Sequence, residues 1–588
     1  MSLRATKRIK DGKEHRYWSI VESKRCQGSR VVQRQVLYLG EINDSQKTAW
    51  CKTIDVVMED ARSRQIAIFP QDRQAPPLDC DVVQVDLSRL QLKRPRQWGA
   101  CWLACSLWEQ LKLDEFWQDR MGVSRQGTRW LNVLKTLVCF RLIDPGSKWR
   151  LHRQWFDQSA MGDLLGEDFS LVQKDKLYRC LDRLLEHKRD FFSYLNKTWQ
   201  MLFDVRFEVL LYDLTSTYFE SDPPEYHGEG GLRRFGYSRD KRSDCVQVVI
   251  ALIVTPEGFP LAYEVMPGNT SDKTTLSDTL KKVEAQYGKS ERIWIMDRGI
   301  PTEETLAEMR NSGMPTSYLV GTPKGRLTKL EQEFIGKPWA QAKESVQVKL
   351  LEKQDEVYIL AKSTARHQKE RGMRQRKLKR LWARLHELQT QSNSRDQLLL
   401  KLGSAKKDAG RAWYLVKVDI PSAQDYEKAG LQFSLRKDKL RTTRLREGRY
   451  LLRSNLTDKD PAILWRHYIL LTEVEQAFKE LKHDLAIRPI YHQKDDRIEA
   501  HIFVAFIAYC LQVTLKHRAK SLAPGLTPRA ILEKFAAMQM VDVELPTSDG
   551  RQLSLSRYTQ PEKDQRLLLQ QLKLTLPEQP PPKITAST

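Results

Sequence analysis

The chain has 588 residues, with 98 Lys and Arg against 75 Asp and Glu, which gives a net charge of +23. Hydrophobic residues make up 40% and charged residues 29%, a composition that excludes a disordered chain, a collagen-like repeat and a small disulfide-rich protein. A positive excess of this size indicates a polyanionic partner, and nucleic acid is the commonest one.

Residues 1–80 are predicted to form a β-hairpin followed by a linker. Polar and apolar residues alternate over 15–43 around a glycine-containing turn, which is the period of paired strands. A proline-bearing stretch at 70–77 is typical of a linker. The first residues lack the apolar run of a signal peptide.

The next segment, 81–205, has a helical period and is rich in tryptophan and basic residues. Pro145-Gly146 separates two of its predicted helices. The pattern favours a helical DNA-binding domain or, equally, a domain that serves packing alone.

Strands and helices alternate over 206–325. Three apolar runs come first, and a helix, a strand, a helix and a last strand follow, which favours a mixed sheet covered by helices. Residues 326–455 interrupt this order with a strongly basic stretch at 364–390 that has leucines at helical spacing. We expect a strand–helix–strand insertion whose helix either binds DNA or is only a solvated charged face.

Residues 456–520 are predicted to be helical, and 521–588 to form a mixed C-terminal region. The apolar run 501–515 is shorter than the ~20 residues of a membrane span, so we expect a buried helix and no membrane segment. The proline-rich end, LPEQPPPK, is predicted to be disordered. Nine scattered cysteines without a metal-site spacing are typical of reduced thiols in a cytosolic protein.

Two aspartates follow apolar strands of the alternating region. Asp213 ends the run EVLLYD, and Asp297 ends the run RIWIMD. The carboxyl ends of strands in an open α/β sheet often carry a site, although an aspartate there can also simply begin a turn.

A third carboxylate lies on a helix predicted over 462–485. Tyr468, Glu475 and Lys482 follow one another at seven-residue spacing and therefore form one stripe along an α-helix. The apolar residues occupy the neighbouring face, which places Glu475 at the edge of the buried side. Glu473 and Glu480 point away from the stripe and are expected to be solvated.

Three carboxylates of this kind can hold divalent metal. Mg²⁺ prefers oxygen ligands, and two ions about 3.5–4 Å apart can stabilise both the attacking and the leaving oxygen of a phosphoryl displacement. The chain has no P-loop, no H-E-x-x-H and no G-x-S-x-G motif, which excludes the simplest NTPase, metalloprotease and serine-hydrolase assignments.

Five segments, in order, resemble the bacterial insertion-sequence DDE transposases. The branch in question has a Y-x2-R-x3-E-x6-K signature and a long insert before the glutamate. The matching segments are YDLTSTYFE, the stretch 236–276, MDRGIPTEETL, GRYLLRSNLTDKDP and the stretch 468–492. Together they span about 206–515, and the N-terminal hairpin is also similar to that of the family.

The resemblance implies an α/β protein whose RNase H-like catalytic core is formed by 206–325 and 456–520, with 326–455 inserted between them. Asp213, Asp297 and Glu475 would be the catalytic residues and the ligands of two Mg²⁺ ions, for which Mn²⁺ can substitute.

One position departs from the signature, because its arginine falls at Leu471. Tyr468 and Lys482 are kept, and by the resemblance they position DNA phosphates. Arg488, Arg298 or a residue of the insertion could replace the missing arginine, and the sequence leaves these alternatives open. The insertion helix is expected to contact the DNA backbone. The residues expected to bind DNA are Tyr468, Lys482, Arg298, Arg488, Arg376 and Lys379.

By this resemblance the chain is a DNA transposase that hydrolyses phosphodiester bonds at the ends of its element and transfers the 3′-OH into target DNA by cut-and-paste. Its partners would be terminal inverted repeats and target DNA, bound by a homodimer in the bacterial cytoplasm at the nucleoid. Two alternatives stay open: an RNase H-like site-specific nuclease, which would cleave without joining, and a non-catalytic DNA-binding protein derived from a transposase.

Overall fold

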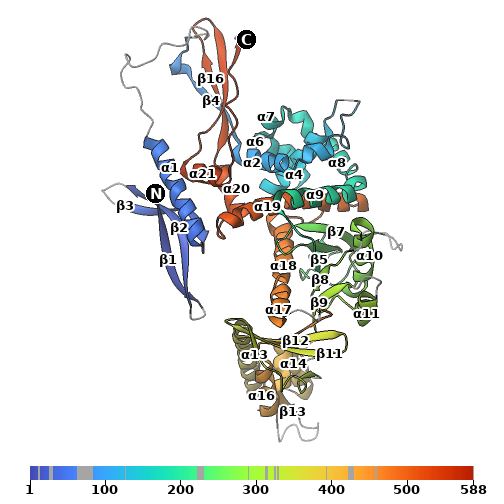
Figure 1. Ribbon diagram of the computed structural model, residues 1–588. Helices are drawn as coiled ribbons and strands as arrows, with labels where there is room; N and C mark the ends of the chain where they lie inside the picture. Colours follow the sequence, from blue (N-terminus) through green and yellow to red (C-terminus); the bar gives the residue numbers. More distant parts are fainter. Residues whose placement is uncertain are drawn as a thin grey trace. The chain divides into compact units, whose positions relative to one another are not determined.

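The computed structural model forms two compact units, Met1–Ser290 with Thr472–Thr588, and Glu291–Leu471 (Figure 1). It describes residues 1–10, 13–25, 31–62, 84–125, 127–220, 231–288, 290–311, 316–322, 326, 330–391, 394–420, 430–456 and 460–586.

The first unit begins with a three-stranded antiparallel sheet, β1 (Ser2–Lys10), β2 (Lys13–Arg25) and β3 (Val31–Gly40), followed by α1 (Asp44–Arg62). The sequence predicted only the hairpin of β2 and β3, and β1 is an additional strand. β1 is basic and largely exposed, so it has no apolar alternation, and its pairing with β2 from Ser2↔Val21 onwards places it in the sheet. The predicted linker at 70–77 lies outside the described residues.

The tryptophan-rich segment is helical, and its large side chains form a core. Its helices are α2 (Gly99–Gln110), α3 (Leu113–Trp117), α4 (Trp130–Ile143), α5 (Lys148–Arg150), α6 (Phe156–Gln158), α7 (Met161–Leu165), α8 (Lys174–Leu181) and α9 (Lys188–Phe203). Trp98, Trp108, Trp117 and Trp199 are fully buried, so these four serve packing, whereas Trp149 is exposed. The helical prediction was wrong for β4 (Gln91–Gln97), which pairs with a strand in the C-terminal region of the chain.

A long apolar helix, α19 (Asp495–Leu522), packs against α2, α4 and α8 of this core (Figure 1). It is longer than the apolar run suggested. By length and composition it could cross a membrane, but 94% of its most apolar window is buried inside the protein. It is therefore the core helix that the sequence predicted.

The C-terminal region of the first unit contains a four-stranded antiparallel sheet in the order β18-β17-β16-β4. Its elements are α20 (Pro528–Ala536), β16 (Gln539–Pro546), β17 (Arg551–Tyr558), α21 (Lys563–Gln571) and β18 (Lys583–Ala586). The prediction of a disordered proline-rich tail was wrong. The backbone carbonyls of Pro577 and Pro580 accept hydrogen bonds from Tyr558 and Arg557, and β18 pairs with β17.

A buried antiparallel sheet completes the first unit: β5 (Val209–Tyr218), β6 (Gln247–Val254) and β7 (Pro260–Pro267), followed by α10 (Leu276–Tyr287). β5 continues five residues past Asp213, which was predicted to end it. Thr215, Ser216 and Thr217 are buried and paired with β6, because β-branched and hydroxyl side chains fit a pleated, packed strand as well as apolar ones do.

The second unit is built on a mixed sheet in the order β10-β11-β12-β15-β9-β8, in which β8 and β9 are parallel and the other pairs antiparallel. Its elements are β8 (Ile293–Met296), α11 (Glu303–Asn311), β9 (Ser317–Gly321), β10 (Ala340–Lys343), β11 (Val346–Lys353), β12 (Glu356–Ser363), β15 (Arg449–Ser454) and α17 (Pro461–Ile469).

Of the insertion predicted at 326–455, the strands β10, β11, β12 and β15 belong to this sheet, and only the part between β12 and β15 leaves it (Figure 1). This part is called the insertion below. Its elements are α13 (Thr364–Thr390), α14 (Arg395–Ala409), β13 (Val416–Asp419), β14 (Gln432–Leu435) and α16 (Lys437–Arg446). The basic helix α13 has the predicted bounds. Its leucines Leu381, Leu385 and Leu388 pack on α14, which leaves the basic residues of the other faces outward.

The single helix predicted over 462–485 is divided. α17 ends at Ile469, α18 (Leu471–Lys479) follows, and Glu480–Asp484 forms a turn of π-helix. A π-turn closes i→i+5 hydrogen bonds and so changes the angular phase of the residues after it. The seven-residue stripe is therefore broken, and Lys482 no longer continues the α-helical line of Glu475.

Candidate active site

Asp213 lies in the middle of β5 in the first unit. Its side chain is half-buried, and its Oδ1 accepts a hydrogen bond from the backbone N–H of Leu214 at 2.8 Å. The neighbouring Tyr212 is fully buried and donates its hydroxyl proton to Thr275 Oγ1 at 2.9 Å, and burial raises the pKa of this tyrosine. The strand that carries Asp213 is thereby fixed on its buried side.

Asp297 follows β8 directly, as predicted, and it is exposed in the second unit. Tyr468, on α17 of the same unit, donates a long hydrogen bond of 3.4 Å to Asp297 Oδ1. Burial raises the pKa of Tyr468, and the negative charge of Asp297 raises it further, so the phenol keeps its proton. Arg298 is exposed beside this pair, and Gly321 leaves the room in which the Tyr468 hydroxyl lies.

Glu475 lies on the exposed side of α18, whose residues Val474, Ala477 and Phe478 are buried. It forms no hydrogen bond or ion pair with another residue in the described part of the chain. This agrees with the predicted position at the edge of the apolar face.

The neighbouring glutamates were predicted to be solvated, and for Glu480 this was wrong. Its side chain is only 5% exposed, and its Oε1 accepts hydrogen bonds from Lys516 at 3.2 Å and Gln476 at 3.0 Å. Glu473 lies 3.6 Å from the same lysine. The π-turn places Glu480 against α19, where a neutral residue would have been expected.

Lys482 and Arg488, two of the predicted DNA contacts, converge on one carboxylate in the first unit. Asp240 Oδ1 lies 2.9 Å from Lys482 Nζ and 2.5 Å from Arg488 Nη1. Burial lowers the pKa of Lys482. Burial alone would raise the pKa of Asp240, but its two cation partners outweigh this effect and hold the pKa of the carboxyl below its usual value. Asp240 was not predicted as a site residue, although the charged run RDKRSD at 239–244 is a visible signal of a polar site.

Arg376 and Lys379 are both exposed on α13, as expected. A different face of this helix borders a cavity of about 890 Å³ in the insertion. Lys377, Arg411 and Lys439 line this cavity and form no ion pair with the described residues. The exposed ring of Tyr414 also lines it. These cations were not identified from the sequence, because they come from three separate segments.

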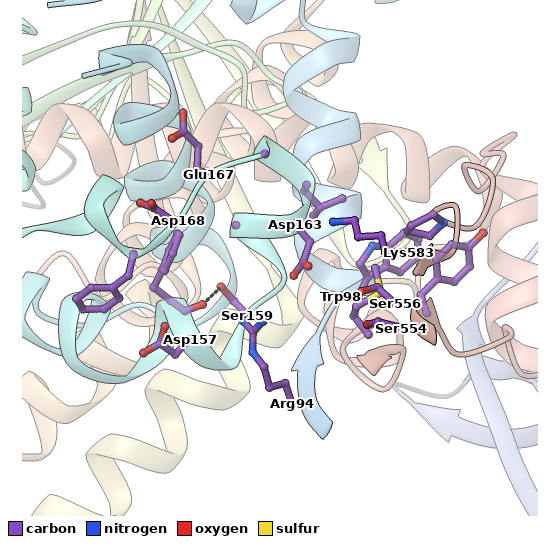
Figure 2. A pocket seen from close by; sticks show the side chains of 18 of the residues that line it. Arg94, Trp98, Asp157, Ser159, Asp163, Glu167, Asp168, Ser554, Ser556 and Lys583 are labelled. Carbon is purple, nitrogen blue, oxygen red and sulfur yellow. Dashed lines mark hydrogen bonds between the residues drawn. The ribbon is translucent and has the colours of Figure 1, made fainter. Parts of the chain in front are cut away.

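A second cavity of about 890 Å³ lies in the first unit between the helical segment and the C-terminal sheet (Figure 2). Its acidic lining residues are Asp157, Asp163, Glu167, Asp168 and Glu578, against the basic Arg94 and Lys583. This lining has the wrong sign for a polyanion, so the cavity is not a candidate for the site.

The three predicted carboxylates fit a divalent metal by their chemistry, since each offers oxygen ligands of the kind that Mg²⁺ prefers. Asp213 and Glu475 belong to the first unit and Asp297 to the second. Within the described ranges, no three His, Cys, Asp or Glu side chains are gathered closely enough to hold a metal ion.

Comparison with protein families decides what the chain is. The family model of the transposase DDE domain matches residues 208–511, more than half of the chain, and the model of the N-terminal domain of IS1634 family transposases matches residues 3–65. The chain belongs to the insertion-sequence DDE transposases. The protein is thus a DNA transposase, an enzyme that cuts and joins DNA strands, and the functional prediction is confirmed.

A piggyBac transposase, solved as a synaptic complex with hairpin DNA, is similar to this transposase at 9% identity and a TM-score of 0.34, with 76% of this chain and 82% of that chain covered. No curated protein sequence matches the transposase. A mixed α/β fold with large sheets is confirmed.

Proposed function

We propose that the transposase cuts DNA at the ends of its element and joins the freed strand to target DNA, with Asp213, Asp297 and Glu475 as its catalytic carboxylates. The observation that carries this proposal is the place of all three within the matched DDE domain at 208–511. Asp297 directly follows β8 and accepts a hydrogen bond from the hydroxyl of Tyr468, so a predicted catalytic carboxylate contacts a residue of the signature.

The carboxylates would hold the divalent ions, two Mg²⁺ with Mn²⁺ able to substitute. When bound, these ions supply charge stabilisation at the attacking and leaving oxygens. Hydrolysis of the phosphodiester leaves a 3′-OH on the element and a 5′-phosphate on the flank. The 3′-OH then attacks a target phosphodiester. A bond forms between the element's 3′-oxygen and the target phosphorus, and the bond from this phosphorus to the target's 3′-oxygen breaks, which releases a target 3′-OH. An RNase H-like core at 206–325 and 456–520 is the arrangement proposed for these steps.

Basic residues would hold the DNA in place. Tyr468 keeps its proton and can donate to a phosphate oxygen once Asp297 is engaged elsewhere. Lys482 and Arg488 offer a paired cationic site, and Arg298 an exposed cation beside Asp297. The insertion would contact the backbone through Arg376 and Lys379, with the cations of its cavity as further contacts. Two element ends would be joined by a homodimer, and target DNA would enter the same site.

The test is cleavage and strand transfer on a DNA that carries both element ends, with Mg²⁺, by wild type, Glu475→Gln and Glu473→Gln. Glu473 is a matched control, because it lies on the same helix and faces Lys516. We expect wild type and Glu473→Gln to cut and join, and Glu475→Gln to bind DNA without cutting. Cleavage without joining would establish the nuclease alternative. Binding without cleavage by all three would establish a non-catalytic DNA-binding protein.

A further inference from the structure

Asp240 joins two predicted DNA contacts that lie apart in the chain. Its side chain is 13% exposed, and those of Lys482 and Arg488 are 10% and 17% exposed. Both cations contact the same oxygen, Oδ1, while Oδ2 is buried without a hydrogen-bond partner among the described residues. A lysine has three N–H donors and an arginine five, so each cation keeps donors for a further acceptor.

The segment that carries Asp240 is anchored along β5, the strand of Asp213. The backbone N–H of Arg239 donates to Ser216 Oγ at 3.3 Å, and the Arg239 side chain pairs with Asp272. The guanidinium of Arg488 lies 5.7 Å from the ring centroid of Tyr218, at the end of the same strand. The cation pair therefore lies beside the strand of a proposed catalytic residue.

Two nearly buried cations that contact the same carboxylate oxygen would destabilise each other without that carboxylate between them. The charged groups that face Lys482 are Asp240, Arg239 and Arg488. Burial lowers the pKa of Lys482, and the two arginines lower it further, whereas Asp240 raises it. Removal of Asp240 would thus favour the neutral amine, which is a weaker phosphate ligand than the ammonium.

The cluster as a whole has one positive charge in excess, since two cations face one carboxylate. A phosphodiester group carries one negative charge, so its arrival would make the cluster neutral. We propose that Asp240 is a positioning residue that keeps Lys482 protonated and beside Arg488, so that the pair binds one DNA phosphate and Arg488 replaces the signature arginine absent at Leu471. This inference rests on the proposed function for its DNA substrate.

The effect of Asp240 and Arg488 on the protonation of Lys482 can be measured without DNA. Neutral amines react with acetic anhydride and ammonium groups do not, so the labelling of Lys482 as a function of pH, read by peptide mass spectrometry on the full chain, gives its titration midpoint. We expect Asp240→Asn to lower the midpoint, Arg488→Gln to raise it, and Asp240→Glu to keep it near that of wild type. Asp244→Asn is the control, because Asp244 lies in the same segment but is exposed and pairs with Arg242.

A midpoint that Asp240→Asn leaves unchanged would overturn the inference, and so would shifts of the same sign in Asp240→Asn and Arg488→Gln. Opposite shifts would not arise from a general loosening of the segment. Should Asp240→Asn fail to fold, the rise expected in Arg488→Gln still decides the question.

The phosphate contact is tested by the affinity for a duplex that carries one element end, measured by fluorescence anisotropy between pH 6.5 and 9. We expect Asp240→Asn to lose at least tenfold in affinity at high pH and to recover part of it at low pH, and Leu471→Arg to restore binding in Arg488→Gln. Equal pH profiles for wild type and Asp240→Asn would contradict the contact. Binding assays separate this outcome from a failure of the proposed function, which would show as intact binding without cleavage.

Discussion

A single absent methyl group at Gly321 allows Tyr468 to reach Asp297. A Cβ at this position would lie 2.6 Å from Tyr468 Oη and 3.4 Å from Arg298 Cβ. We expect Gly321→Ala to destabilise the second unit by about 1–3 kcal/mol, the usual cost of overpacking, and to reduce DNA cleavage because the tyrosine is displaced.

The matched variant is the double change Gly321→Ala with Tyr468→Phe, which removes the clashing hydroxyl. Urea denaturation should show most of the lost stability restored, whereas Tyr468→Phe alone should cost little, because the bond it loses is long. If Gly321→Ala and the double variant were equally stable, the added methyl group would not be clashing with the Tyr468 hydroxyl.

Another residue-scale prediction concerns acid stability at His492. Burial lowers the pKa of His492 to about 3, and the charges of Lys148, Arg497 and Arg141 contribute in the same direction. Lys148 Nζ donates to His492 Nε2 at 2.9 Å, so the neutral imidazole is the form that the fold uses. In the unfolded chain the pKa returns to about 6.5, so between these values the unfolded state binds more protons.

The stability that the neutral His492 contributes is therefore expected to be fully present above pH 6.5 and to fall as the pH is lowered towards 3. His492→Gln, which can still accept from Lys148, should show a shallower fall in unfolding free energy between pH 6.5 and 4. His483→Gln is the control, since this histidine is exposed on the π-turn. Identical slopes in wild type and His492→Gln would refute the assignment.

At the scale of elements, the docking of the π-turn on α19 depends on a buried ion pair. Glu480 is 5% exposed and Lys516 is 22% exposed, with 3.2 Å between Nζ and Oε1. Lys516→Met should destabilise the first unit by about 3 kcal/mol, near the lower end for a broken buried pair because the lysine retains some solvent. Adding Glu480→Gln should recover part of the loss in urea denaturation, and additive losses would show that the pair is not coupled.

The sequence predicted elements better than the contacts between them. α13 was predicted with its observed bounds, because its leucines recur at helical spacing. In the structure, Ser363 caps its first turn by accepting from the N–H of Arg366. The true end of β5 at Tyr218 was missed, since the buried hydroxyl residues that follow Asp213 look like a turn in sequence. Asp240 and Lys482 are 242 residues apart, and no spacing rule relates residues at that separation.

At the scale of the whole molecule, the net charge of +23 is distributed unevenly among surfaces. The cavity of the first unit has an acidic lining, whereas the cavity of the insertion presents cations without described ion-pair partners. A polyanion is attracted to the second kind of surface and repelled by the first. Composition alone indicates such a partner, but only the folded chain shows which surface can receive it.

The salt dependence of DNA binding tests which cations of the insertion take part. Each phosphate neutralised adds about 0.9 to the slope of log K against log salt, so two lost contacts lower the slope by about 2. We expect this decrease for Arg376→Ala with Lys379→Ala on the outer face of α13, and for Lys377→Ala with Arg411→Ala in the cavity. Arg384→Ala should leave the slope unchanged, because this residue of the same helix pairs with Glu387 at 2.6 Å. A pair whose removal leaves the slope unaltered lies on a merely solvated surface, and the DNA path over the insertion would then follow the other face.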